Sequence, residues 1–242
     1  MGARVVTTTA VIIQARQSST RLPGKGLADI AGKPALARVL ERCLKIEGAD
    51  VIVCALPDGP RDDVLEVVIA EAADYGRILV YRGPEDDVLA RFLGAAEMVA
   101  ADVIMRITAD CPLIDAEVCS EVLATACESF SDSVGGINYC SNCYPERTYP
   151  QGLDCEVFTI KALRAAHYHA ATPYDREHVT PWIQENLNWS ILKKSGENLS
   201  HLRWTLDYAD DLNLLRKLFG SGLPISTMDE VLEAIKKLEE ST

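Results

Sequence analysis

The stretch AVIIQARQSSTRLPGKGLADIAGKP, residues 10–34, contains a strand signal and the loop that follows it. Its first residues are continuously apolar, which suits a buried strand. The rest carries Arg16, Arg21, Lys25 and Lys33 among glycine and proline breaks, and its first acid is Asp29. The whole chain of 242 residues has 36 acids against 24 lysines and arginines, a formal net charge of −12. Cations gathered on a glycine-rich loop of an acidic protein indicate a local site for an anion.

The chemistry of this loop suits a polyphosphate. Glycines let backbone N–H groups approach the phosphates, the hydroxyls of residues 18–20 can donate hydrogen bonds, and the cations offset negative charge. The loop is not a Walker A motif, because Lys25 is followed by Gly26 and not by serine or threonine, and it lacks the dinucleotide fingerprint G-x-G-x-x-G. A solvated basic loop without a ligand is the alternative that spacing alone leaves open.

Strand and helix signals alternate through the first half of the chain. The apolar patterns predict strands at 10–15, 50–56, 77–83, 102–108 and 132–138, and helices at 34–46, 61–76, 85–100 and 115–130. This alternation predicts an α/β fold of three layers, Rossmann-like, with a mostly parallel sheet covered on both faces. Ligands of such sheets bind outside the carboxyl ends of the strands, where the basic loop falls.

The rhythm changes after residue 138. Residues 139–151 are polar and aromatic without periodicity, and they predict an irregular insertion that covers a pocket or joins a dimer. Strand signals follow at 153–160, 189–194 and 202–207, and helix signals at 161–171, 175–187, 209–219 and 227–239. We expect a single domain over 1–242, with a nucleotide-binding part at about 8–138, an acceptor or dimer part at about 139–206 and C-terminal helices at 208–242.

Composition excludes several classes of function. The acidic balance argues against general binding to nucleic acid or to an anionic membrane, since both require a basic face. No convincing signal peptide and no membrane-spanning run is found, so we expect a cytoplasmic protein with reduced cysteines. Cys140 and Cys143 form a lone Cys-x-x-Cys, for which coincidence is favoured over zinc because a second ligand pair of familiar spacing is missing.

Two aspartates follow apolar strand signals far apart in the sequence. Asp110 comes directly after 102–108, and Asp207 ends 202–207. Two carboxylates brought together by the fold make a hard oxygen site, which suits Mg²⁺. Local roles are the alternative: a turn or helix cap for Asp110, and a helix start for Asp207.

Several motifs resemble those of a known family. They are IIQARQSSTRLPGKGLADIAGKPALARVLER, RGPEDDVLARF, RITADCPLID, GLDCEVF, DREHVTPW and LRWTLDYADDL, and they are spread over almost the whole chain. Together they resemble the cytidylyltransferases that activate acidic sugars, namely the 3-deoxy-manno-octulosonate and acylneuraminate enzymes and, most closely, the spore coat polysaccharide biosynthesis protein F group. The resemblance implies a nucleotide-diphospho-sugar transferase fold and transfer of CMP from CTP to an acceptor, with release of pyrophosphate.

The resemblance also implies roles for individual residues. Arg16 and Lys25 would bind the CTP phosphates and act in catalysis together with Asp110 and Asp207, which would coordinate Mg²⁺. The other residues expected on the nucleotide side are Ala15, Ser19, Thr20, Arg21, Arg82 and Asp86. The resemblance is weaker evidence for the loop of Arg82 and Asp86, because Asp86 and Asp87 also suit an ordinary helix N-terminus.

The segments GLDCEVF and YDREHVTPW resemble acceptor-contacting parts of the family. The residues expected there are Gln151, Asp154, Glu156, Arg176, Glu177 and His178. Arg176 could pair with an acceptor carboxylate or phosphate through its planar fork, and His178 could position an acceptor oxygen or act as a base. Salt bridges within the protein and a partly buried histidine are the structural alternatives.

Readings from three classes of function compete. The leading one is a Mg²⁺-dependent enzyme that transfers CMP from CTP to a small acidic sugar and works as a homodimer in surface polysaccharide or glycoconjugate synthesis. A close alternative keeps the reaction but uses a phosphorylated or phosphonate acceptor, because an arginine fork accepts carboxylate and phosphate alike. A glycosyltransferase with a nucleotide-sugar donor is a different enzyme class, and ADCP (109–112) lacks the second aspartate of an Asp-x-Asp motif. A nucleotide sensor without turnover is the third.

Overall fold

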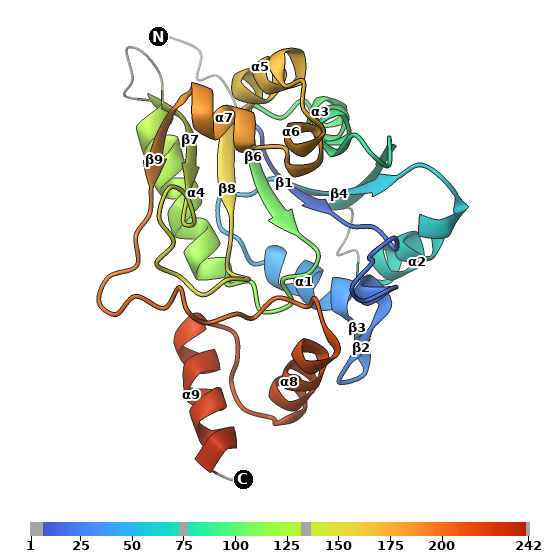
Figure 1. Cartoon of the computed structure of the whole chain (residues 1–242), viewed down its shortest axis with the longest axis vertical. Helices are drawn as coiled ribbons and strands as arrows, with labels where there is room; N and C mark the ends of the chain where they lie inside the picture. The colour runs from blue at the N-terminus through green and yellow to red at the C-terminus, as the bar shows by residue number, and fades with distance from the viewer. Residues whose placement is uncertain (1–6, 73–76, 132–136, 241–242) are drawn as a thin grey trace.

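A computed structural model gives the arrangement of residues 7–72, 77–131 and 137–240. Its centre is a seven-stranded sheet in the order β5-β4-β1-β6-β8-β7-β9 (Figure 1). The strands are β1 (Thr9–Gln14), β4 (Val51–Pro57), β5 (Ile78–Gly83), β6 (Val103–Thr108), β7 (Ile137–Ser141), β8 (Glu156–Thr159) and β9 (Asn188–Ile191). Strand β8 runs antiparallel to both of its neighbours, and the other pairs are parallel. The predicted α/β class with a mostly parallel sheet is therefore confirmed.

Alternation along β1 shows how the sheet divides the core. Val11 and Ile13 pack in one cluster with α1 (Ala35–Cys43), α2 (Asp63–Ala72) and α4 (Ala116–Ser131). Ala10 and Ile12 pack in the other with α3 (Val88–Met98), α5 (Ile160–His169) and α7 (Pro181–Asn186). Because neighbouring strand residues face opposite sides, helices cover both faces of the sheet. No helix in the described part of the chain is long and apolar enough to cross a bilayer.

A third cluster lies below the sheet in the view of Figure 1. It joins α8 (Ala209–Gly220) and α9 (Met228–Glu240) to Ile30, Trp204 and Leu206. Ile30 belongs to a small hairpin of β2 (Asp29–Ile30) and β3 (Lys33–Pro34), which the sequence patterns did not predict. The C-terminal helices therefore pack against both the segment before Asp207 and the segment after the basic loop.

Two predicted elements are wrong. Residues 202–207 were predicted as a strand, but they form only an isolated bridge, between Gln151 and Arg203, outside the seven-stranded sheet. The predicted helix 175–187 is two helices, α6 (Pro173–His178) and α7. Between them Val179 has a φ of 72°, outside the right-handed helical region, and Pro181 begins the next helix. Parts of the predicted helix 61–76 and strand 132–138 lie outside the described residues.

Candidate active site

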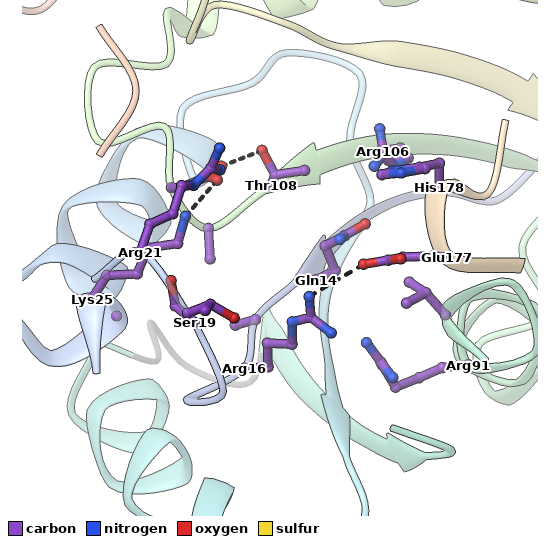
Figure 2. Close-up of a pocket in the computed structure, with 16 residues that line it drawn as sticks. Gln14, Arg16, Ser19, Arg21, Lys25, Arg91, Arg106, Thr108, Glu177 and His178 are labelled. Atoms are coloured by element: carbon purple, nitrogen blue, oxygen red, sulfur yellow. Dashed lines mark hydrogen bonds and ion pairs between the residues drawn. The ribbon is translucent and has the colours of Figure 1, made fainter. Parts of the chain in front are cut away.

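A cavity of about 400 Å³ lies at the carboxyl ends of β1 and β6 (Figure 2). This is the edge of the sheet where a ligand was expected. The lining residues are Gln14, Ala15, Arg16, Ser19, Thr20, Arg21, Lys25, Gly26, Val88, Arg91, Arg106, Thr108, Ala109, Asp110, Glu177 and His178. They come from the basic loop, α3, β6 and α6, so the fold assembles this cavity from segments that are far apart in the sequence.

The basic loop is held in shape mainly by backbone groups. The buried carboxylate of Asp62 accepts the backbone N–H of Gln17 at 2.7 Å, and the Gln17 carbonyl accepts from Ser19 at 2.9 Å. Gly24 has a φ of 70°, which glycine adopts without the cost that a Cβ adds, and a short helical turn, η1 (Lys25–Leu27), follows it. This turn directs the ammonium group of Lys25 back toward the sheet.

Lys25 lies between the two predicted metal ligands. Its Nζ is 2.7 Å from Oδ2 of Asp110 and 3.1 Å from Oδ1 of Asp207. Arg21 adds a second cation, with Nη2 at 2.7 Å from the same Asp207 oxygen. The side chains of Lys25, Asp110 and Asp207 are 18%, 24% and 9% exposed. Lys25 and Asp110 line the cavity, whereas Asp207 is not among the lining residues and lies behind them.

The segment that carries Asp207 is fixed by its neighbours. The backbone N–H of Leu206 donates to the carbonyl of Asp110 at 2.8 Å, which ties the two aspartates together through the main chain. Asp211, in the first turn of α8, accepts the backbone N–H groups of Asp207 and Tyr208 at 2.9 and 2.8 Å. Asp207 is thus held in place without belonging to a strand.

The charges of the cluster support one another. Burial raises the pKa of Asp110, but the charge and hydrogen bond of Lys25 and a bond from Thr108 outweigh it, so the pKa lies below its ordinary value. Burial lowers the pKa of Lys25, but both carboxylates raise it, and the net direction is upward. Asp110 and Lys25 therefore both carry their charges at neutral pH.

This cluster makes stability depend on pH at the acidic end. Because the pKa of Asp110 is lower in the folded state, its contribution is present above the unfolded value of about 3.9 and is lost as pH falls through the folded value. We expect the difference in free energy of unfolding between wild type and Asp110→Asn to shrink as pH falls below about 4. Urea titrations from pH 6 to pH 3 measure this difference, and a constant difference would contradict the assignment.

Most of the other residues predicted on the nucleotide side line the cavity. Ala15, Ser19 and Thr20 line the cavity, as does Arg16, whose Nη2 is 3.3 Å from Oε1 of Glu177 on the opposite wall. Figure 2 shows this contact across the opening. Both of its side chains are about half exposed, so it contributes little to stability. A ligand anion can replace Glu177 at Arg16 without a large cost.

Arg82 and Asp86 are not among the lining residues. The guanidinium of Arg82 pairs with Asp63 and Glu66 at the start of α2 and donates to the carbonyl of Pro57 at 2.7 Å. Asp86 is exposed in the turn before α3, whose N-cap is the neighbouring Asp87. In this conformation Arg82 braces β5 against α2 and does not face the cavity.

The predicted acceptor residues are also divided. Glu177 and His178 line the cavity, whereas Arg176, directly before them, does not. Arg176 pairs with Asp87, with Nε at 3.0 Å from Oδ2, and donates to the carbonyl of His167 at 2.9 Å. Its fork is therefore occupied by the protein and fixes α6 to the start of α3.

The predicted acceptor residues of the 151–156 segment also lie outside the cavity lining. Gln151 is exposed, and its backbone bonds to Leu202 and Trp204. Asp154 pairs with Arg147. Glu156 is buried and pairs with Arg106, which does reach the cavity. The cavity lining contains no residue of 139–156, so a covering role of the irregular insertion is not seen at this cavity.

Four polar lining residues had no predicted role: Gln14, Arg91, Arg106 and Thr108. The sequence signal was a polar residue inside an otherwise apolar element. Arg106 and Thr108 interrupt VIMRIT, and Arg91 interrupts VLARFLGAAEM. Arg91 is 1% exposed, and its Nη1 donates to the carbonyls of Pro84 and Glu85. It ties the turn before α3 to the cavity wall.

The two carboxylates meet the requirements of a magnesium site. Oxygens of Asp110 and Asp207 both lie within 3.1 Å of one cationic nitrogen, so they converge on a single cation. Mg²⁺ commonly binds one or two carboxylates and completes its shell with substrate phosphates and water. Among the described residues no group of three or more His, Cys, Asp or Glu could hold a metal, so an all-protein cage is not seen there.

The sequence profile of the cytidylyltransferase family matches residues 10–241. The chain belongs to this family. As a cytidylyltransferase it is a nucleotidyltransferase, and its basic loop and two aspartates lie within the matched region. The predicted family and enzyme class are confirmed.

Relatives of named function support the same family. Over 180 residues the chain is 33% identical to the spore coat polysaccharide biosynthesis protein SpsF of Bacillus subtilis, covering 72% of this chain and 69% of the relative. Over 220 residues it is 28% identical to the 3-deoxy-manno-octulosonate cytidylyltransferase of Yersinia enterocolitica, covering 86% and 83%. A solved cytidylyltransferase from Leptospira borgpetersenii is 29% identical with a TM-score of 0.87, covering 97% of this chain and 96% of that one. The fold is therefore that of the cytidylyltransferases.

Proposed function

We propose that this cytidylyltransferase transfers CMP from CTP to a small anionic acceptor, an acidic sugar of the ulosonate or nonulosonate type, for surface polysaccharide or glycoconjugate synthesis. The observation that carries the proposal is the cavity lined by the basic loop, Asp110 and His178, with Asp207 joined to it through Lys25. The name of the Yersinia enzyme supplies the acceptor class, and that of SpsF supplies the link to polysaccharide synthesis.

In the proposed reaction an acceptor hydroxyl attacks the α-phosphorus of CTP. A bond forms between the acceptor oxygen and the α-phosphorus, the bond to the β-phosphate oxygen breaks, and pyrophosphate leaves with the electron pair. Arg16 and Lys25 face the phosphates and stabilise the charge that develops on them. His178 lines the opposite wall and can accept the proton of the hydroxyl.

Asp110 and Asp207 would hold Mg²⁺. When bound, the ion offsets negative charge on the phosphates and on the leaving pyrophosphate. Before CTP binds, Lys25 and Arg21 supply the positive charge that keeps these two carboxylates close together. The same cations then face the phosphates, so the loop serves both the empty and the filled site.

We also propose that the chain acts as one catalytic domain in a homodimer. Segments between Gln14 and Asp207 meet at the cavity or pair with its residues, which supports a single domain. Tyr144 of the irregular insertion stacks edge-on against Trp189, which is 40% exposed, and this aromatic surface is the candidate interface. Sedimentation should give twice the chain mass of 26.5 kDa, and Trp189→Glu should give the single mass.

The reaction is tested by product analysis. The enzyme is incubated with CTP and Mg²⁺ and with one acceptor at a time: 3-deoxy-manno-octulosonate, an acylneuraminate, or a sugar phosphate. We expect one class to release pyrophosphate and to give a new phosphorus resonance. A phosphodiester resonance means an acidic-sugar product, and a mixed pyrophosphate means a phosphorylated acceptor. Failure of both classes would contradict the proposal.

A further inference from the structure

Arg106 and Thr108 lie two residues apart on β6, so their side chains share one face of the sheet, and both line the cavity. Ala109 and Asp110, in the turn directly after the strand, line it as well. Asp110 belongs to the phosphate end, beside Lys25. Arg106 therefore lies further back along β6, and Figure 2 shows it beside His178, away from Lys25 and Arg21.

The guanidinium of Arg106 is fixed by one carboxylate, and its remaining N–H groups have no partner in the described part of the protein. One Nη1 contact to Oε2 of Glu156 fixes the guanidinium. Its Nε is buried without a hydrogen-bond partner, and among the described residues no partner is found for Nη2. The side chain is 15% exposed and lines the cavity, so part of the fork is available to a ligand.

The charge of Arg106 is only partly compensated. Oε1 of Glu156 already accepts from Tyr139 at 2.7 Å, from Thr180 at 2.8 Å and from Gln184 at 3.0 Å. Four donor groups share this one buried carboxylate, so its negative charge is spread over all of them. Burial lowers the pKa of Arg106, but the charge and hydrogen bond of Glu156 outweigh this effect, so the net direction is upward. The guanidinium therefore remains charged beside the cavity.

The other arginines near the cavity are engaged elsewhere. Arg176 pairs with Asp87 and with a backbone carbonyl. Arg91 donates to two backbone carbonyls through Nη1, and although its Nε also has no partner, Arg91 is only 1% exposed. Arg21 pairs with Asp207 at the phosphate end. Arg16 belongs to the loop that faces the CTP phosphates. Arg106 is therefore the arginine best placed for a second anion.

We propose that Arg106 binds the anionic group of the acceptor, a carboxylate or a phosphate, in the role that the sequence assigned to Arg176. The proposal rests on the proposed function, because it takes a small anionic acceptor as given. A guanidinium fork binds either group through two parallel hydrogen bonds. Anchoring the acceptor at Arg106 places it between His178 and the CTP phosphates, where its hydroxyl must react.

The test separates acceptor binding from nucleotide binding. Arg106→Gln alone would leave Glu156 as an unpaired buried carboxylate, so the variant used is Arg106→Gln/Glu156→Gln, with Glu156→Gln as its matched control. Each protein is saturated with Mg²⁺ and a CTP analogue that has a methylene group between the α- and β-phosphorus. Two probes are then titrated calorimetrically: 3-deoxy-manno-octulosonate for a carboxylate and inorganic phosphate for a phosphate.

We expect at least one probe to bind the wild type and the Glu156→Gln control, and to bind the double variant at least 30-fold more weakly. Affinity for the CTP analogue should change less than threefold. A preference for the sugar acid indicates a carboxylate acceptor, and a preference for phosphate indicates a phosphorylated one. Equal probe binding by the double variant and its control, or no probe binding to the loaded wild type, would overturn the role of Arg106. Failure of the analogue itself to bind the wild type would instead count against the proposed function.

Arg106→Lys provides a second variant that keeps the charge and the contact to Glu156. It retains the ammonium but loses the planar fork, so we expect probe affinity to fall three- to tenfold with an unchanged melting temperature. Wild-type probe affinity in this variant would show that the fork is not used.

Discussion

Replacing Lys25 by methionine should lower kcat for CMP transfer by about 100- to 1,000-fold. In the proposed reaction Lys25 faces the CTP phosphates, and it contacts both aspartates. Removal of one preorganised group of this kind typically costs that much. Stopped-flow or coupled pyrophosphate assays measure the rate. Lys33→Met is the matched control, because Lys33 lies in the same basic stretch but is exposed and pairs with Glu41.

The same variant should show a stability change that depends on magnesium. Without Lys25, the carboxylates of Asp110 and Asp207 lose the cation that they share. In metal-free buffer we expect a loss of roughly 2–3 kcal/mol in free energy of unfolding, less than for a fully buried pair because the side chains are partly exposed. Addition of Mg²⁺ should restore most of it. Wild-type kcat, or a loss that Mg²⁺ leaves unchanged, would contradict the shared-cation arrangement.

Replacing Gly152 by alanine should destabilise the protein by about 3 kcal/mol or more. Gly152 has a φ of +107°, and an added Cβ would lie 2.9 Å from the backbone carbon of Trp204 and 3.0 Å from the backbone nitrogen of Thr205. Backbone strain contributes roughly 1–3 kcal/mol, and forced displacement in a packed region contributes a similar amount. The displaced segment leads directly to Asp207, so CTP turnover should fall as well.

Gly196→Ala is the control for this substitution. Gly196 also has a positive φ, +83°, but no atom lies within 4 Å of the added Cβ. It therefore tests the strain alone, at about 1 kcal/mol. Urea unfolding of the two variants gives the comparison. If Gly152→Ala costs no more than Gly196→Ala, the close approach of residue 152 to the segment before Asp207 is not as described.

The parts of the fold that the sequence predicts well are those where local pattern and tertiary packing agree. Strands β1 and β4 are almost continuously apolar because they are buried in a sheet covered on both faces. Strands β5 and β6 keep enough of this pattern to be recognised, although each contains an arginine. Residues 202–207 show a similar pattern for a different reason. Trp204 and Leu206 pack against α8 and α9, so their alternation reflects a separate cluster and not membership of the sheet.

In the candidate site, too, the residues that were predicted correctly are those whose position follows from local pattern and sheet topology. The basic loop and Asp110 were expected at one edge of the sheet because parallel strands place their carboxyl ends together. The partner of Arg176 could not be predicted, since Asp87 is 89 residues away and shares no local pattern with it. Arg106 was missed because the environment of an arginine inside an apolar strand depends on Glu156, which lies on the neighbouring strand.

In the proposed function the cavity binds CTP with the help of Mg²⁺ held by Asp110 and Asp207. Calorimetric titration of CTP, UTP, ATP and a UDP-sugar, with and without Mg²⁺, tests it on wild type and Asp110→Asn. We expect selective CTP binding that requires Mg²⁺ and that Asp110→Asn weakens at least tenfold. No CTP binding together with binding of the UDP-sugar would contradict it, and would mean that the basic loop holds the donor of a glycosyltransferase.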